Sequence, residues 1–177
     1  MEDSPTQRSP VAVPGPTGRR PWSTMLLREW AAARYPGVPL REQLRLGPTT
    51  SELNGRTVSP AMQRAMSVFN WFSDGILVLD DQVLCIEAKL RATPAAVSQV
   101  EFYLQQMIRT PELQQYMNRP FVPLVLWAID DPAVSAYARG RGVRVEVYTP
   151  AWIEDWMSQV LYRTRRTNPP KAPGETT

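Results

Sequence analysis

The chain has no histidine and a single cysteine among its 177 residues. The absence of histidine excludes Ser-His-Asp and Cys-His catalysis, zinc bound through imidazole, and nucleases that use histidine as the general base. The lone Cys85 cannot form an internal disulfide, and it excludes a cysteine cluster for zinc or iron–sulfur. Any hydrolysis in this chain must therefore depend on carboxylates, lysine and a metal ion.

Lysine is nearly absent as well, because the 20 basic residues comprise 18 arginines and 2 lysines. Lys171 lies near the C-terminus, so Lys89 is the only lysine of the part that we expect to fold. In a chain that uses arginine for generic positive charge, a lone lysine indicates a role particular to lysine. Such a role needs a compact ammonium or a pKa that the surroundings can shift.

The net charge of +3 comes entirely from the two ends of the chain. Residues 1–21 contribute +1 and residues 164–177 contribute +2, whereas residues 22–163 hold 14 basic and 14 acidic side chains. Both ends are rich in proline and poor in residues that could bury surface, which predicts disordered arms flanking one folded domain over 22–163. The arms are either solubilising ends or segments that bind phosphate or a partner.

Long hydrophobic segments are also missing. The N-terminus is polar and has no apolar stretch typical of a secretory signal. The longest apolar run, residues 121–129, contains Pro123 and is too short to span a bilayer. With 43% apolar and 21% charged residues, the composition predicts a soluble, cytoplasmic domain with no membrane partner.

Periodicity and capping signals predict an alternation of helices and strands. Helices are expected at residues 25–34, 59–66, 94–108, 131 to 140 or 142, and 151–161, and strands at residues 40–46, 71–79, 83–90, 121–129 and 143–148. The strands at 71–79 and 83–90 form an antiparallel hairpin, and the later strands alternate with helices as parallel crossovers do. These features predict a single α/β domain with a mixed central sheet flanked by helices. There is no GxGxxG or GxxxxGK[ST] motif, so a nucleotide-binding fold is not indicated.

The hairpin brings together three charged residues. Because side chains alternate along a strand, Glu87 and Lys89 share one face, and burying them is costly unless they are paired or bind a metal. Counted back from the turn, Asp74 lies across the hairpin at nearly the same level. Two carboxylates with a backbone carbonyl form a suitable oxygen site for Mg²⁺. With Lys89 beside it, this set suits metal-assisted phosphodiester hydrolysis.

The pattern of Asp74 followed by Glu87-Ala88-Lys89 resembles the PD-(D/E)XK nuclease superfamily, with Ser73 in place of the signature proline. Gln99 and Tyr103, which lie on one face of the next predicted helix, are similar to the QxxxY motif of its RecB-like branch. The resemblance covers about residues 25–160 and implies a restriction-endonuclease-like core. It also extends to small phage-encoded proteins of this superfamily.

The resemblance implies a catalytic role for Asp74, Glu87, Lys89, Gln99 and Tyr103, with metal held by Asp74, Glu87 and the Ala88 carbonyl. It further implies that Gln99 and Tyr103 orient the nucleic-acid strand. Many members also carry an acidic residue on the first helix. Glu29 has the best context for that position and is a further, weaker candidate.

Other interpretations of these residues remain open from the sequence. Glu87 and Lys89 could be a solvated pair on an edge strand, Asp74 with Gly75 a plain turn, and Gln99 with Tyr103 ordinary helix surface. Cys85 is expected to be a small buried apolar residue. The six tryptophans are expected in the core or at an interface, and one of them could stack on a nucleobase.

Two functions follow. The first is a Mg²⁺-dependent nuclease acting on DNA. The second is a non-catalytic protein with a nuclease-like fold, serving as a structural or DNA-binding subunit of a larger assembly such as a phage virion, or as a homo-oligomer. The neutral charge of residues 22–163 favours the second, because a neutral surface tracks a polyanion poorly.

Overall fold

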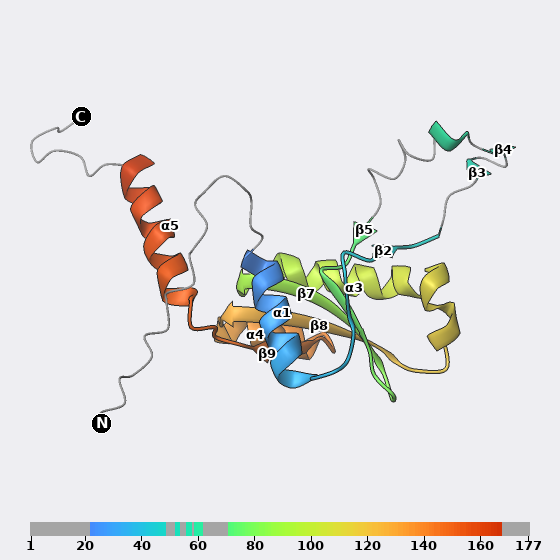
Figure 1. Ribbon diagram of the computed structural model, residues 1–177, viewed down its shortest axis with the longest axis horizontal. Coiled ribbons are helices and arrows are strands. Elements are labelled where there is room, and N and C mark those ends of the chain that lie inside the picture. Colours follow the sequence, from blue (N-terminus) through green and yellow to red (C-terminus); the bar gives the residue numbers. More distant parts are fainter. Residues whose placement is uncertain (1–21, 49–51, 54–55, 58, 62–70, 168–177) are drawn as a thin grey trace, which may run out of the picture.

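The protein is described by a computed structural model that covers residues 22–48, 52–53, 56–57, 59–61 and 71–167. A five-stranded mixed sheet forms its centre, with the strand order β1-β6-β7-β8-β9 (Figure 1). The strands are β1 (Leu40–Glu42), β6 (Gly75–Val78), β7 (Val83–Arg91), β8 (Phe121–Ile129) and β9 (Arg144–Val147). β6 and β7 pair antiparallel, and β7, β8 and β9 run parallel, which confirms the mixed α/β sheet expected from the sequence.

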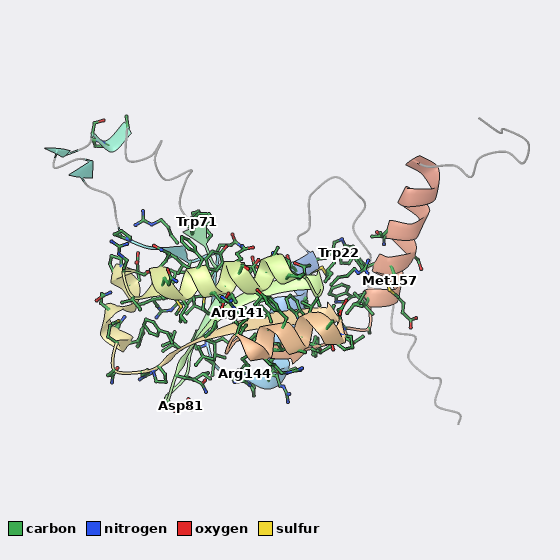
Figure 2. All side chains as sticks on the ribbon, turned by 180° about the vertical axis from the view of Figure 1, so that it is seen from behind. Trp22, Trp71, Asp81, Arg141, Arg144 and Met157 are labelled. Carbon is green, nitrogen blue, oxygen red and sulfur yellow. The ribbon has the colours of Figure 1, made fainter. Side chains whose placement is uncertain are left out.

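Helices cover both faces of this sheet. On one face lies α1 (Trp22–Arg34), and on the other lie α3 (Pro94–Met107) and α4 (Pro132–Gly140), as Figures 1 and 2 show from opposite sides. A short 3-10 helix, η1 (Pro111–Tyr116), follows α3 and was not expected from the sequence. The last helix, α5 (Ile153–Thr167), projects from the end of the sheet (Figure 1).

The alternation of β7 divides the core into two apolar layers. Leu84, Ile86 and Ala88 pack with α1, whereas Val83 and Cys85 pack with α3. This is the division that the period-two pattern predicts. Glu87 is completely buried, so the interpretation as a solvated edge-strand pair is wrong for this residue.

Two strands predicted as continuous are broken, and the two breaks face each other. The predicted strand 40–46 divides into β1 and β2 (Arg45–Leu46) at Gln43, whose φ of 51° turns the chain sharply. The predicted strand 71–79 divides into β5 (Trp71–Phe72) and β6. Gln43 N donates to the Asp74 carbonyl at 3.3 Å, so the chains leave the central sheet together and pair again as the ribbon β2–β5. A second small ribbon joins β3 (Glu52–Leu53) and β4 (Arg56–Thr57).

The helix boundaries differ from the predictions mainly at the chain ends. α1 begins at Trp22, and α5 continues to Thr167, so residues 164–167 are helical although the sequence assigned them to a disordered tail. Residues 1–21 and 168–177 of the predicted arms, and 62–66 of the predicted helix 59–66, lie outside the described residues. Within the described part of the chain, no helix combines the length and apolar character needed to span a bilayer.

Candidate active site

Asp74 lies at the bend between β5 and β6, where the central sheet begins. Because Gly75 pairs with Ile86, Asp74 is level with Glu87 on the neighbouring strand. Its Oδ2 atom accepts a hydrogen bond from Ala88 N at 2.9 Å, so the carboxylate takes the position that a further β6 residue would occupy. The interpretation of Asp74 as a plain turn former is therefore wrong, since its side chain is tied to β7.

A glycine at position 75 lets the chain reach this point. A Cβ atom built there would lie 2.9 Å from Leu27 Cδ2 and 3.0 Å from Leu40 Cδ1, both closer than normal packing allows. The main chain therefore passes directly beneath α1 before it enters β6. This close approach determines where the adjacent Asp74 carboxylate meets β7.

Glu87 has one paired and one unpaired carboxylate oxygen. Oε1 accepts a hydrogen bond from Lys89 Nζ, whereas the buried Oε2 has no hydrogen-bond partner among the described residues. Lys89 Nζ also lies 4.0 Å from Asp74 Oδ2, so its ammonium bridges the two carboxylates. A buried oxygen without a partner is costly, and a bound ion or water molecule is one way in which native proteins satisfy such a group.

The two carboxyl groups are shifted toward their neutral forms. Burial raises the pKa of Glu87 to about 7, and the charge of Asp74 acts in the same direction, against the opposing effect of Lys89. Burial also raises the pKa of Asp74, opposed by the hydrogen bond from Ala88 and the charge of Lys89. A single ammonium thus does not compensate both carboxylates, and an additional cation would stabilise their ionised forms.

Gln99 and Tyr103 lie on the face of α3 that covers the Glu87 side of the sheet. Tyr103 is 3% exposed, and Gln99 Nε2 donates a hydrogen bond to its hydroxyl. The pKa of Tyr103 is raised to about 12, mainly by burial and in smaller part by the charges of Glu87 and Asp74, against the opposing hydrogen bond with Gln99. The phenol therefore lies within electrostatic range of both carboxylates. The structure brings the five candidate catalytic residues together across β6, β7 and α3.

The donor set fits a hard divalent cation. In an antiparallel pair, the N–H and the C=O of one residue point toward the same neighbouring strand. Because Ala88 N donates to the Asp74 carboxylate, the Ala88 carbonyl also points to the side of β7 on which Asp74 lies. Glu87 Oε2, Asp74 and this carbonyl are oxygen ligands of the kind that Mg²⁺ prefers. The described residues contain no group of three acidic, cysteine or histidine side chains placed for a metal, so water and substrate would complete the coordination shell.

Glu29 is not brought to this site. It lies on α1, which packs against the opposite face of the sheet, and its Oε1 accepts a hydrogen bond from Trp152 Nε1 at 2.7 Å. Trp152 also contacts Trp22, with ring centroids 5.2 Å apart and an angle of 39° between the ring planes. Glu29 thus connects α1 to the segment that precedes α5. Its place on the first predicted helix could not reveal this contact.

Arg91 is a residue that the sequence analysis missed. It follows Lys89 by two positions on β7, so it continues the same face, and it is exposed. Within the described chain, its guanidinium has no ion-pair or hydrogen-bond partner. The period-two pattern that joined Glu87 to Lys89 could have identified Arg91 by one further step.

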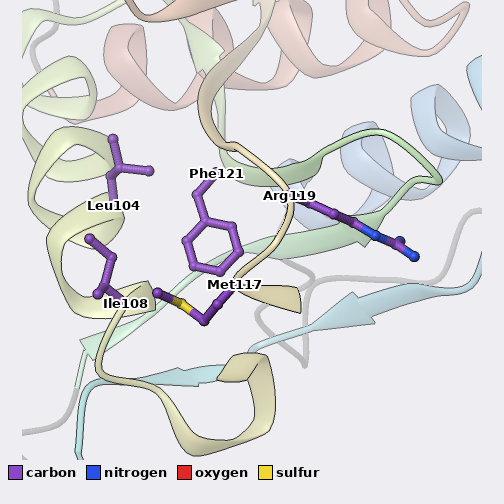
Figure 3. A pocket seen from close by; sticks show the side chains of 5 residues that line it. All are labelled: Leu104, Ile108, Met117, Arg119 and Phe121. Carbon is purple, nitrogen blue, oxygen red and sulfur yellow. The ribbon is translucent and has the colours of Figure 1, made fainter. Parts of the chain in front are cut away.

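A pocket of about 270 Å³ opens near the C-terminal end of α3 (Figure 3). It is lined by Leu104, Ile108, Met117, Arg119 and Phe121. The Arg119 guanidinium donates to the Leu79 carbonyl. Since the pocket includes none of the candidate catalytic residues, it is separate from the carboxylate site.

Comparison with known proteins identifies no family. No family model and no curated protein matches the chain. A similar solved structure is the crystal structure of a protein of unknown function, AF1548, with 12% sequence identity and a TM-score of 0.42. The match covers 78% of this chain and 65% of that protein.

Proposed function

We propose that the chain is a metal-dependent nuclease that hydrolyses DNA phosphodiester bonds. The observation that supports this most directly is the buried Glu87 carboxylate, which lies level with Asp74. One of its oxygens accepts from Lys89, and the other has no partner in the part of the chain that the structure describes. We further propose membership of the RecB-like branch of the PD-(D/E)XK superfamily. The support is that Gln99 and Tyr103 lie on α3, the helix that covers the face of the sheet from which Glu87 and Lys89 project. The charge of Glu87 acts on the Tyr103 hydroxyl.

In this proposal, Asp74, Glu87 and the Ala88 carbonyl hold Mg²⁺ or Mn²⁺. The bound ion would polarise the scissile phosphate and lower the pKa of a water molecule. Lys89 Nζ, held between the carboxylates, positions the attacking water and offsets negative charge that develops on the phosphate. No step requires histidine, which agrees with the composition of the chain.

The residues around this centre have binding roles. The Gln99 amide and the Tyr103 hydroxyl are hydrogen-bonded to each other, and they orient the nucleic-acid backbone at the α3 side. Arg91 extends the positive charge of Lys89 by one step along β7 and contacts the adjacent phosphate. The substrate path thus follows the C-terminal half of β7.

The test is cleavage of single- and double-stranded DNA with Mg²⁺ or Mn²⁺. We expect Asp74→Asn and Lys89→Ala each to lower the rate by at least about 10²-fold, as loss of one preorganised charge typically does. Lys89→Arg should also be impaired, because a planar guanidinium does not replace a compact ammonium between two carboxylates. Glu112→Gln, an exposed acidic residue on η1, is the matched control and should retain full activity. Activity that survives in both Asp74→Asn and Lys89→Ala would refute the assignment.

A second candidate function is a non-catalytic structural or DNA-binding subunit of a larger assembly, such as a phage virion. It is favoured by the balance of 14 basic and 14 acidic side chains over residues 22–163. The native particle size and a Mn²⁺ titration separate the two candidates. A large complex that binds no Mn²⁺ at Asp74 and Glu87 would support the structural role and a virion location, whereas a small Mn²⁺-binding protein would support the nuclease and a cytoplasmic location.

A further inference from the structure

An exposed aromatic pair is formed by Trp71, three residues before Asp74, and Phe102, the residue before Tyr103. Trp71 on β5 is 50% exposed and Phe102 on α3 is 36% exposed, with ring centroids 4.8 Å apart and an interplanar angle of 66°. Figure 2 shows Trp71 at the outer side of α3. Two large aromatic rings that contact each other and still leave this much surface uncovered form an apolar surface open to a ligand.

The main chain holds Trp71 in this position. Across the β2–β5 ribbon Trp71 pairs with Leu46, and cross-strand partners project to the same side. Leu46 is 3% exposed and packs in the core layer that includes Tyr103. Trp71 is therefore directed toward α3 by the ribbon itself, and the platform of Trp71 and Phe102 is set by backbone pairing.

Both rings are close to the candidate catalytic residues along the chain. Trp71 precedes Asp74 by three residues, so their backbones lie at most about 10 Å apart. Phe102 is next to Tyr103 and lies one helical turn after Gln99, on the neighbouring face of α3. A nucleotide whose phosphate lies at Asp74 would therefore have a neighbouring base within reach of the platform.

We propose that Trp71 and Phe102 form a stacking platform for an unpaired nucleobase, so that the preferred ligand is single-stranded nucleic acid. This inference rests on the proposed nuclease function. Proteins that bind single strands combine a few backbone cations with aromatic rings on which bases stack. Lys89 and Arg91 supply such cations, and the neutral charge of residues 22–163 suits stacking better than tracking of an intact duplex. An intact duplex keeps its bases stacked internally and cannot use the platform.

The test measures binding in EDTA, so that metal-dependent cleavage does not interfere. Fluorescein-labelled oligothymidylate, an abasic deoxyribose-phosphate oligomer of equal length, and a duplex are titrated at about 50 mM salt, where phosphate contacts are strong. We expect Trp71→Ala and Phe102→Ala to weaken oligothymidylate binding by about 5- to 150-fold, the range for loss of stacking on one base. Binding of the abasic oligomer should be unchanged, because it offers phosphates without bases.

Two variants serve as matched controls. Trp71→Phe keeps an aromatic ring and should retain most of the affinity for oligothymidylate. Tyr137→Ala removes an aromatic side chain that is 43% exposed on α4 and is not part of the Trp71–Phe102 pair, and it should bind like the wild type. Since Trp71 and Phe102 are partly exposed, circular dichroism should show that their alanine variants fold.

Several outcomes would overturn the platform. The first is that both alanine variants bind oligothymidylate as tightly as the wild type, and the second is that they lose as much affinity for the abasic oligomer as for oligothymidylate. The third is that the wild type binds the duplex more tightly than oligothymidylate. The fourth is that the wild type shows no binding up to about 100 µM, the weak end of non-specific affinity. Cleavage with Mg²⁺ is measured separately. If the wild type shows the base-dependent binding without any cleavage, the nuclease proposal fails and the platform stands. If cleavage requires Lys89 but oligothymidylate binding is unchanged in Trp71→Ala, the platform proposal is wrong and the nuclease proposal is not.

Discussion

Replacing Glu87 with glutamine should stabilise the metal-free protein at neutral and alkaline pH. Glutamine has the shape of a protonated glutamate, so it can occupy the same buried site without ionising. The pKa of Glu87 is about 7 in the folded protein, against an ordinary value of 4.5. Because the folded protein binds this proton more tightly than the unfolded chain does, the free energy of unfolding falls as the pH rises between these values.

The size of this effect follows from the two pKa values. At about 1.4 kcal/mol for each pH unit between them, the wild type loses about 3 kcal/mol of stability by pH 8 and only about 1 kcal/mol at pH 5. The glutamine variant avoids this loss. For a chain of this size, the gain at pH 8 corresponds to an increase in Tm of about 6–12 °C.

The assay is thermal unfolding in EDTA at pH 5 and pH 8, followed by circular dichroism. The Tm of Glu87→Gln should be clearly higher than that of the wild type at pH 8 and only slightly higher at pH 5. Glu112→Gln, at an exposed site, should stay within about 0.5 kcal/mol of the wild type at both values. A Glu87→Gln variant less stable than the wild type at pH 8 would show that Lys89 compensates the buried carboxylate fully, and would refute the reasoning.

Added Mg²⁺ provides a second measurement on the same proteins. At about 100 times its Kd, the ion should stabilise the wild type by about 2.7 kcal/mol at pH 8, because it binds only the folded state. The effect should weaken below pH 7, since protons compete for Glu87. In Glu87→Gln the stabilisation should be lost, so the same substitution would raise the stability of the apo protein and remove metal binding.

Two further predictions concern the surroundings of the site. Arg91→Ala should reduce by about 1 the slope of log binding constant against log salt concentration, measured on oligothymidylate, whereas Arg139→Ala, an exposed arginine on α4, should leave the slope unchanged. Gly75→Ala should cost about 1–3 kcal/mol in urea unfolding, because its Cβ would lie 2.9 Å from Leu27 Cδ2. Gly140→Ala is the control, since a Cβ there meets nothing within 4 Å; equal midpoints for the two variants would contradict the close packing.

Local features of the sequence were sufficient for most of the elements. Thr93 and Asp131 cap α3 and α4 as their positions before proline predict, and their side chains accept hydrogen bonds from the first turns. The alternation along β7 correctly separated its two faces. Such features depend on neighbouring residues and on one repeat length, so they can be read without knowing the rest of the molecule.

The strand breaks could not be predicted in this way. Leu40, Leu44 and Leu46 occupy alternate positions of one predicted strand, with Glu42 at the fourth, but the left-handed backbone of Gln43 divides this segment. That conformation accompanies the hydrogen bond from Gln43 N to the Asp74 carbonyl, a contact between segments 31 residues apart. Alternation describes which side chains share a face, and it contains no information on which strand a segment will join.

The candidate site shows the same division. The sequence by itself determined that histidine chemistry is impossible, that Glu87 and Lys89 share a face, and that Asp74 can approach them across a hairpin. Only the tertiary structure decided that Glu87 is fully buried with one oxygen unpaired among the described residues, and that Trp71 meets Phe102. Residue type and spacing determine what a side chain can do chemically. The burial of a side chain and its partners depend on packing between distant segments. This packing decides the pKa of Glu87, its missing hydrogen bond among the described residues, and the exposed surface of Trp71 and Phe102.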